Sequence, residues 1–163
     1  MCYEAETIAN AFLKIAEEDG YSLTPMKLQK LLYFAQGHSL SLLDKSLIRD
    51  DCQCWPYGPV YPHVYTALRC YGSNMIEAPI VDKSKCERFD LRQINDKDFS
   101  FLRSIWKRYR RFDAFYLSEL THVPNGPWAN TVATVHSNER PVIGKTLIRD
   151  FFNSLKKKRD GIS

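Results

Sequence analysis

Two cysteines one residue apart, Cys52 and Cys54, are the first candidates for chemistry in this sequence. Zinc sites are typically built on Cys-x-x-Cys pairs, and no second close cysteine pair completes a set of four ligands here. His63 is near enough along the chain to suggest a mixed site, which is the less favoured interpretation. We therefore interpret Cys52 and Cys54 as semi-buried thiols, and we predict no metal and no other cofactor.

Catalytic arrangements are equally weak in the sequence. A cysteine and a histidine could act as nucleophile and base only if folding brought them together, and nothing local favours this. The carboxylate pairs Asp50-Asp51 and Glu17-Glu18 lie in segments typical of a solvated surface. The chain has no P-loop and no Gly-x-Gly-x-x-Gly motif, and its seven glycines mostly fall at turns and helix ends. We predict no catalytic residues, and we expect that the protein is not an enzyme.

A proline-rich aromatic segment, here called the elbow (residues 52–62), separates two strongly helical patterns. Its three prolines fix φ and cannot donate backbone hydrogen bonds, while Gly58 supplies conformational freedom before Pro59. We expect the elbow to be rigid without regular backbone hydrogen bonding, provided that its aromatic rings pin it against the flanking helices.

Hydrophobic periodicity predicts a mainly α-helical, single compact domain over residues 1–163, with about six or seven helices and no separate DNA-binding domain. Thr24-Pro25 is the clearest helix start, because a capping hydroxyl precedes a proline at the first helical position. Asp96 and Asp113 are expected to cap two later helices. The expected helices cover residues 6–18, 25–42, 62–72, 97–111, 114–122, 127–135 and 145–159. Periodicity fails between them at residues 76–91, which predicts a minor extended or hairpin element.

The net charge of +4 is mildly basic, which permits an acidic partner without demanding one. The most basic run, Lys156–Arg159, ends the last expected helix, where cations complement the helix dipole; a nucleic-acid contact is the alternative. No secretory leader is evident and no apolar run approaches the length of a membrane span. We therefore expect a cytoplasmic protein with reduced thiols and no membrane partner.

Several motifs follow one another in a fixed order along the chain. They are Leu28-Gln29-Lys30-Leu31-Leu32-Tyr33-Phe34-Ala35-Gln36-Gly37, Trp55-x-x-Gly58-Pro59-Val60-x-Pro62-x-Val64-Tyr65, Leu117-Ser118-x-Leu120-Thr121-His122, Pro127-Trp128 and Ile148-x-x-Phe151-Phe152. This ordered set resembles the Panacea domain family, which includes SocA-like antitoxins and phage-associated GepA-like proteins. The departures are mild: Cys54 stands where a small residue such as alanine is more usual, and residues 123–126 are individual to this chain.

The resemblance implies an antitoxin-type binding protein that neutralises a cognate toxin by direct protein–protein contact. The toxin is often encoded by an adjacent gene, many relatives belong to phages or mobile elements, and some look like adaptors that present the toxin to a protease. Enzymatic activity is not part of what the family is known for. A nucleic-acid-binding transcriptional regulator is the alternative function, and a small enzyme or metal protein is the second alternative.

The aromatic rings around the elbow are candidates for partner contacts, because large side chains with few rotamers dominate protein interfaces. The same rings could instead hold the elbow onto its helices, and Tyr33 could serve as core packing. Lys27, Lys30 and His63 are expected to be the more exposed contacts. The candidate partner-binding or motif residues are Lys27, Lys30, Tyr33, Trp55, Tyr57, Gly58, Pro59, Tyr61, His63, Tyr65, His122 and Trp128.

Overall fold

The computed structural model describes residues 1–135 and 139–161. Within these ranges the chain is mainly α-helical, as predicted. The helices are α1 (Ala5–Glu18), α2 (Pro25–Leu42), α3 (Pro62–Leu68), α4 (Asp96–Tyr109), α5 (Ala114–Thr121), α6 (Pro127–Val132) and α7 (Lys145–Arg159). The strands are β1 (Gln53–Trp55), β2 (Gly58–Val60), β3 (Val81–Asp82) and β4 (Glu87–Arg88), and they form two small antiparallel sheets.

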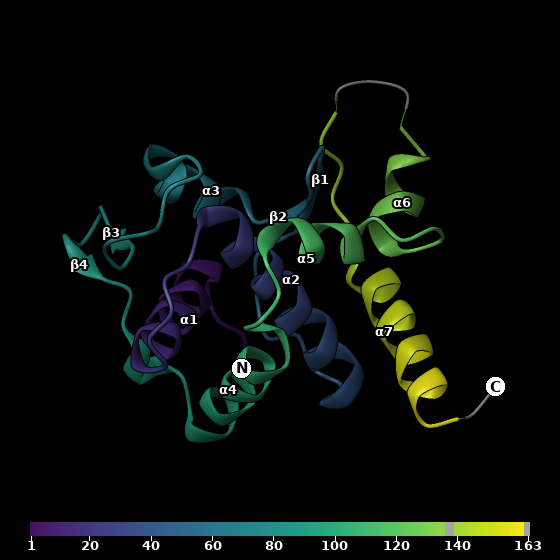
Figure 1. Cartoon of the computed structure of the whole chain (residues 1–163), viewed down its shortest axis with the longest axis horizontal. Coiled ribbons are helices and arrows are strands. Elements are labelled where there is room, and N and C mark those ends of the chain that lie inside the picture. Colours follow the sequence, from purple (N-terminus) through teal and green to yellow (C-terminus); the bar gives the residue numbers. More distant parts are fainter. Residues whose placement is uncertain (136–138, 162–163) are drawn as a thin grey trace.

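Helix α2 is the centre of the fold (Figure 1) and packs against α1, α3, α4, α5 and α7. All residues from 28 to 40 are buried, so the helix is enclosed on every side. Because a buried polar group is costly without a hydrogen-bond partner, the polar side chains of α2 must find partners inside the protein. Most of these polar side chains form hydrogen bonds with backbone groups of the segments that surround the helix.

Local side-chain caps mark three of the seven helix starts in the described ranges. The Thr24 hydroxyl accepts a hydrogen bond from the Lys27 N–H at 3.3 Å, and the Asp113 carboxylate accepts one from the Tyr116 N–H at 2.8 Å. Both caps confirm the prediction. The expected cap at Asp96 is wrong: Asn95 accepts from the Asp98 N–H at 2.9 Å, and Asp96 is already the first helical residue. Its carboxylate there complements the positive end of the helix dipole.

Helix α7 docks on α2 at a glycine. The Phe152 ring lies directly over Gly37, where an added Cβ would stand only 2.2 Å from Phe152 Cε2. The ring also meets Tyr33 edge to face, with centroids 5.7 Å apart, and contacts the His38 ring at 4.9 Å. The glycine therefore allows the two helices to approach closely and to enclose an aromatic core between them.

The elbow forms a regular β-hairpin, which corrects the expectation of a segment without backbone pairing. Strands β1 and β2 pair Gln53 with Val60 and Trp55 with Gly58. Residues 141–143 add a third extended segment on the other side of β1, since the Cys54 N–H donates to the Pro141 carbonyl at 2.8 Å. Two of the prolines stand in the turn and at the start of α3, so only Pro59 lies inside a strand.

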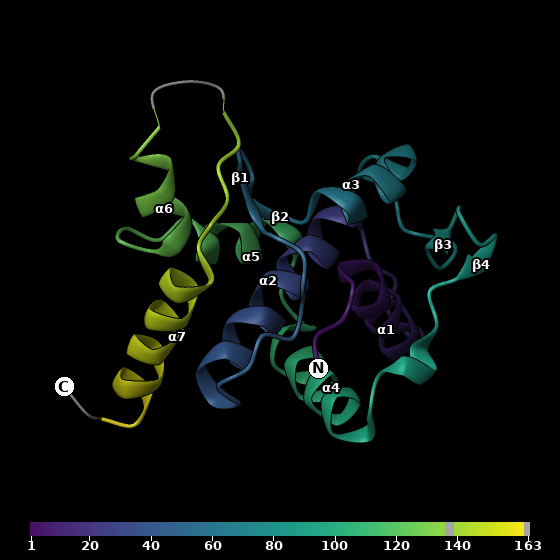
Figure 2. The same cartoon turned by 180° about the vertical axis from the view of Figure 1, so that it is seen from behind.

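The predicted hairpin around residues 76–91 is confirmed as β3 and β4, which pair through Val81 and Arg88. Both views place it at the opposite end of the molecule from α6 and α7 (Figures 1 and 2). Among the helices in the described ranges, none combines the length and the apolar character needed to cross a membrane.

Candidate functional site

The turn of the β1–β2 hairpin is held by three side chains, one from α5, one from the residue that follows it and one from α6. Trp128 Nε1 donates to the Trp55 carbonyl at 2.8 Å. His122 Nε2 lies 3.2 Å from the Pro56 carbonyl, and the Ser118 hydroxyl donates to the Tyr57 carbonyl at 2.6 Å. These side chains, here called the turn clamp (Ser118, His122 and Trp128), engage three consecutive carbonyl groups and so fix the turn backbone.

Helix α2 holds the other end of the hairpin. The Gln29 side chain accepts from the Tyr61 N–H at 2.8 Å and donates to the Tyr61 carbonyl at 3.1 Å. Lys30 Nζ donates to the Pro59 carbonyl, also at 3.1 Å. The motif residues that lie far apart in the sequence therefore meet in space, where they bind the backbone of one short hairpin.

Lys30 was expected to be exposed, and this is wrong because the side chain is only 1% exposed. Burial lowers its pKa to about 8. The ammonium group lies under Gly58, where an added Cβ would stand 2.9 Å from Lys30 Nζ and 2.6 Å from Thr121 Oγ1. Lys30 is thus an internal support of the hairpin and not a contact residue.

The buried ammonium predicts a specific pH dependence of stability. Because the pKa of Lys30 is about 8 in the folded chain and near 10.5 in the unfolded chain, the unfolded chain binds more protons between these values. Wild type should therefore gain stability over Lys30→Met as pH rises from about 8 to 10.5, by up to about 1.4 kcal/mol per pH unit. Urea unfolding gives the free energy of unfolding of both proteins at each pH. Tyrosines and cysteines titrate in both proteins, so their contributions cancel in the difference between the two. A difference that does not change with pH would contradict the assignment.

Several of the aromatic candidates differ sharply in exposure. Tyr57 at the tip of the turn is 70% exposed and Tyr65 is 43% exposed, whereas Tyr61 and Tyr33 are each 1% exposed. Trp55 lies between, half-buried against Tyr65, with ring centroids 4.6 Å apart. Only the exposed rings are available to a partner, so the alternative of core packing holds for Tyr33 and Tyr61.

Lys27 and His63 lie apart from the hairpin turn. Lys27 Nζ donates to the Arg110 carbonyl at 2.6 Å and lies over the Trp106 ring, which corrects the expectation of a free exposed lysine. His63 is exposed as predicted, with Nδ1 3.3 Å from a carboxylate oxygen of Asp50. Neither residue contributes to the surface around Tyr57.

The mixed metal site weighed for His63 and the two cysteines does not assemble. His63 faces Glu6 and Asp50 instead, which form with it the one group of three potential metal ligands among the described residues. Asp50 also accepts a hydrogen bond from the Ala5 N–H at 2.8 Å, so capping of α1 accounts for its position. Burial raises the pKa of the Cys54 thiol to about 11, which disfavours the reactive thiolate at neutral pH.

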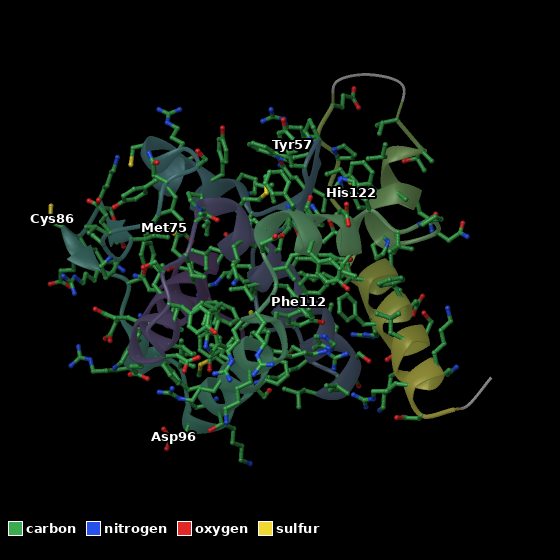
Figure 3. The ribbon with its side chains drawn as sticks, in the orientation of Figure 1. Tyr57, Met75, Cys86, Asp96, Phe112 and His122 are labelled. Atoms are coloured by element: carbon green, nitrogen blue, oxygen red, sulfur yellow. The ribbon has the colours of Figure 1, made fainter. Side chains whose placement is uncertain are left out.

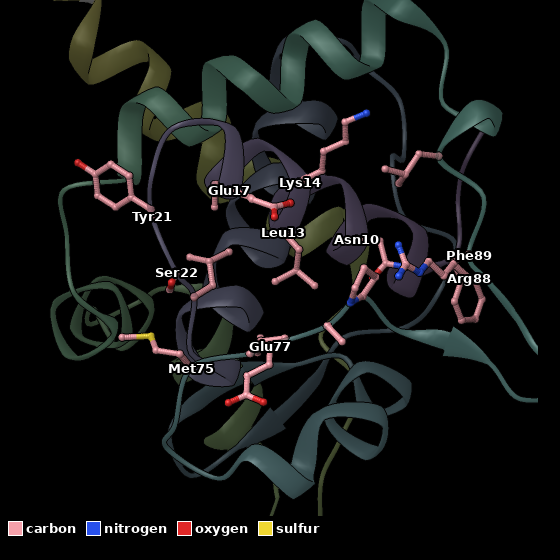
Figure 4. Close-up of a pocket in the computed structure, with 16 residues that line it drawn as sticks. Asn10, Leu13, Lys14, Glu17, Tyr21, Ser22, Met75, Glu77, Arg88 and Phe89 are labelled. Atoms are coloured by element: carbon pink, nitrogen blue, oxygen red, sulfur yellow. The ribbon is translucent and has the colours of Figure 1, made fainter.

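A groove of about 690 Å³ is lined by α1 and residues 21–23 on one side and by residues between 75 and 91 on the other (Figure 4). It is far from the turn clamp and contains none of the predicted site residues. Asn10 lies in its wall and uses its amide to pair with both backbone groups of Ile80, at 2.7 and 2.9 Å. Charged side chains of both signs, including Lys14 and Glu17, line the groove without converging on one point. We therefore interpret the groove as the gap between two packed segments and not as a ligand site.

Sequence reasoning missed two kinds of residue. Gln29 and Ser118 belonged to the motifs but were not selected, although their side chains hold the hairpin backbone. Phe115 was not selected either, and it is 74% exposed. Its spacing of three residues from Ser118 places both on one face of α5, which was the available signal.

The chain matches the family described as "Antitoxin SocA-like, Panacea domain" over residues 28–129. Antitoxin SocA from Caulobacter vibrioides (strain NA1000 / CB15N) is 27% identical over 128 residues, which cover 77% of this chain and 68% of that protein. No solved structure matches the chain significantly. The family match runs from α2 to α6 and contains the hairpin with every side chain of the turn clamp.

Proposed function

Since this chain belongs to the SocA-like Panacea domain family, we propose that it is an antitoxin that binds a cognate protein toxin directly and blocks its action. The toxin is encoded by an adjacent gene, and the complex forms in the cytoplasm. Presentation of the toxin to a protease is a further step that this binding allows. The proposal includes that the chain is not an enzyme, which is supported by the burial of Cys52 and Cys54.

One observation supports a binding role most strongly: Tyr57 is 70% exposed on a turn whose carbonyl groups are held by three side chains. An exposed tyrosine on a mobile loop would lose conformational entropy on binding. A ring on a fixed turn loses little, and tyrosine is among the residues that contribute most to protein interfaces. The hairpin therefore has the properties of a preorganised contact element.

The proposal predicts that Tyr57→Ala abolishes rescue without unfolding the protein. The neighbouring reading frame is expressed in a bacterial host with and without this chain, and growth is measured. Wild type should restore growth, while Tyr57→Ala should bind the toxin at least roughly ten-fold more weakly. Because the side chain is mostly exposed, the thermal midpoint should change little.

Met75→Ala is the matched control, because Met75 is 53% exposed and lies apart from Tyr57 (Figure 3). It should rescue growth as well as wild type does. A toxic neighbour that wild type fails to relieve, although the chain is soluble, would rule out this pairing. Equal rescue by Tyr57→Ala and wild type would remove the hairpin from the interface.

A further inference from the structure

Three aromatic side chains are exposed where α4 meets α5. Phe112 is 37% exposed, Phe115 is 74% exposed and Tyr116 is 45% exposed. The Phe112 and Tyr116 rings lie against each other, with centroids 4.7 Å apart. Single exposed apolar residues are common on protein surfaces, but a group of rings at one corner is typical of an interaction site. We call this group, together with its cations, the α4–α5 corner (residues 107–116).

The α4–α5 corner is continuous with the hairpin turn. Phe115 lies on the same face of α5 as Ser118, the clamp residue that donates to the Tyr57 carbonyl, and the clamp residue His122 directly follows the helix. Figure 3 shows Tyr57, His122 and Phe112 arranged around this helix. The exposed rings of the turn and of the corner therefore belong to one surface.

Positive charges border these rings. Arg108 and Arg111 are exposed, and no carboxylate in the described part of the chain forms an ion pair with them. Lys107 faces α1 instead, beside Glu18 and Asp19. The Arg108 guanidinium lies 5.7 Å from the ring centroid of Tyr109, which in turn contacts Phe112. Arg110 is different, because it pairs with Asp19 at 2.7 Å.

The charge of Arg108 also acts beneath the surface. Burial first, and then the charges of Arg108 and Arg159, lower the pKa of His38 to about 4. Two cations from α4 and α7 therefore act on the same point beneath the surface. A partner with negative charge gains from both the short contacts and this wider field.

We propose that the toxin binds across Tyr57, Phe115 and the α4–α5 corner, and that the matching toxin surface is a folded protein surface with carboxylates around an apolar contact. This inference rests on the proposed function and adds the contact face and the chemistry of the partner. Aromatic anchors would supply the apolar centre of the interface, while Arg108 and Arg111 would pair with the surrounding acidic groups.

A nucleic acid fits this surface less well than an acidic protein does. Two exposed carboxylates, Asp113 and Glu119, are close in the sequence to the exposed rings and would repel a continuous row of phosphate groups. The Phe112 and Tyr116 rings are inclined to each other by 40°, so they do not form a flat platform on which bases would stack. A protein partner carries cations as well as carboxylates, so its cations can pair with Asp113 and Glu119, which a nucleic acid cannot do.

The test compares toxin binding by wild type, Arg108→Glu/Arg111→Glu and Phe115→Ala, with the product of the neighbouring reading frame as the probe. Charge reversal should weaken binding at least roughly ten-fold and flatten its dependence on salt between about 50 and 300 mM. Phe115→Ala should weaken binding to a similar extent and keep the salt dependence of wild type. Both variants should fail in the growth rescue.

Lys83→Glu/Arg88→Glu is the matched control, because it makes the same change of charge at β3–β4, which lies apart from the α4–α5 corner (Figure 1). It should bind the toxin as wild type does. Because Arg108 and Arg111 also complement the end of α4, Arg108→Gln/Arg111→Gln serves as a milder variant, and circular dichroism verifies that each protein is folded.

The outcomes separate the two proposals. If wild type neither binds the product nor rescues growth, the proposed function fails, and the contact surface fails with it. If wild type binds and the charge-reversed protein binds equally well, only the contact surface is wrong. Wild type and the charge-reversed protein are also tested for binding to a DNA duplex of about 20 base pairs. If wild type binds the duplex and the charge-reversed protein does not, while both bind the toxin equally well, the surface is reassigned to nucleic acid.

Discussion

Gly37→Ala is expected to lower the free energy of unfolding by roughly 3 kcal/mol, the upper end of the usual range for overpacking. In an unconstrained helix this change would add about 1 kcal/mol of stability, because alanine is the better helix former. Here the new Cβ would stand 2.2 to 2.5 Å from three atoms of the Phe152 ring. The ring is 2% exposed and wedged between Tyr33 and His38, so it has no free space into which to retreat.

A double-mutant cycle separates this clash from other effects. Urea unfolding is measured for wild type, Gly37→Ala, Phe152→Leu and the combined variant. The smaller leucine leaves room for the new methyl group, so Gly37→Ala should cost much less in the Phe152→Leu background than in wild type. Equal costs in both backgrounds, or a stabilising effect of alanine, would contradict the close contact between α2 and α7.

The starts of α2 and α5 could be predicted from the sequence because their capping signals are local. The Thr24 and Asp113 side chains each bond to a backbone N–H three residues further along the chain, so a short stretch contains both partners. The misplaced cap at Asp96 shows the limit of such signals. Asn95 and Asp96 are both good capping residues, and only the backbone conformation decides that Asn95 adopts the extended geometry of a cap.

The hairpin could not be predicted because its support comes from distant segments. Three prolines within 52–62 argue against a strand on local grounds, yet β1 gains a second neighbour from residues 141–143. Two prolines also fall outside the strands, which sequence spacing alone does not reveal. The pairing therefore depends on tertiary contacts that no window of the sequence contains.

The motif residues meet at one hairpin, but the motifs did not reveal which of them face solvent. Lysine is almost never fully buried, so an exposed Lys30 was the natural expectation. Its partner, the Pro59 carbonyl, is 29 residues away and has no sequence signature. Tyr57 and Tyr61 show the same ambiguity, because both are tyrosines of one short segment and only folding places one outside and the other in the core.

Gly58→Ala is expected to lower the free energy of unfolding by about 4 kcal/mol. The molecules of this variant that remain folded are expected not to bind the toxin. Two effects add. The residue has φ of +113°, which strains an alanine by about 1 to 3 kcal/mol. The new Cβ would also meet Thr121 Oγ1 at 2.6 Å and Lys30 Nζ at 2.9 Å, which displaces the hairpin from α2 and α5. Tyr57 directly precedes this residue, so its ring would lose its fixed position.

Gly20→Ala isolates the first effect, because Gly20 has φ of +76° and no atom within 4 Å of an added Cβ. Urea unfolding should show a cost of about 1 kcal/mol for Gly20→Ala, with unchanged growth rescue. The excess cost of Gly58→Ala then combines the steric contacts with Thr121 and Lys30 and any greater strain of alanine at φ of +113°. Two equal costs would mean that the hairpin is free to shift on its helices, and the clamped turn would no longer explain how Tyr57 is presented to a partner.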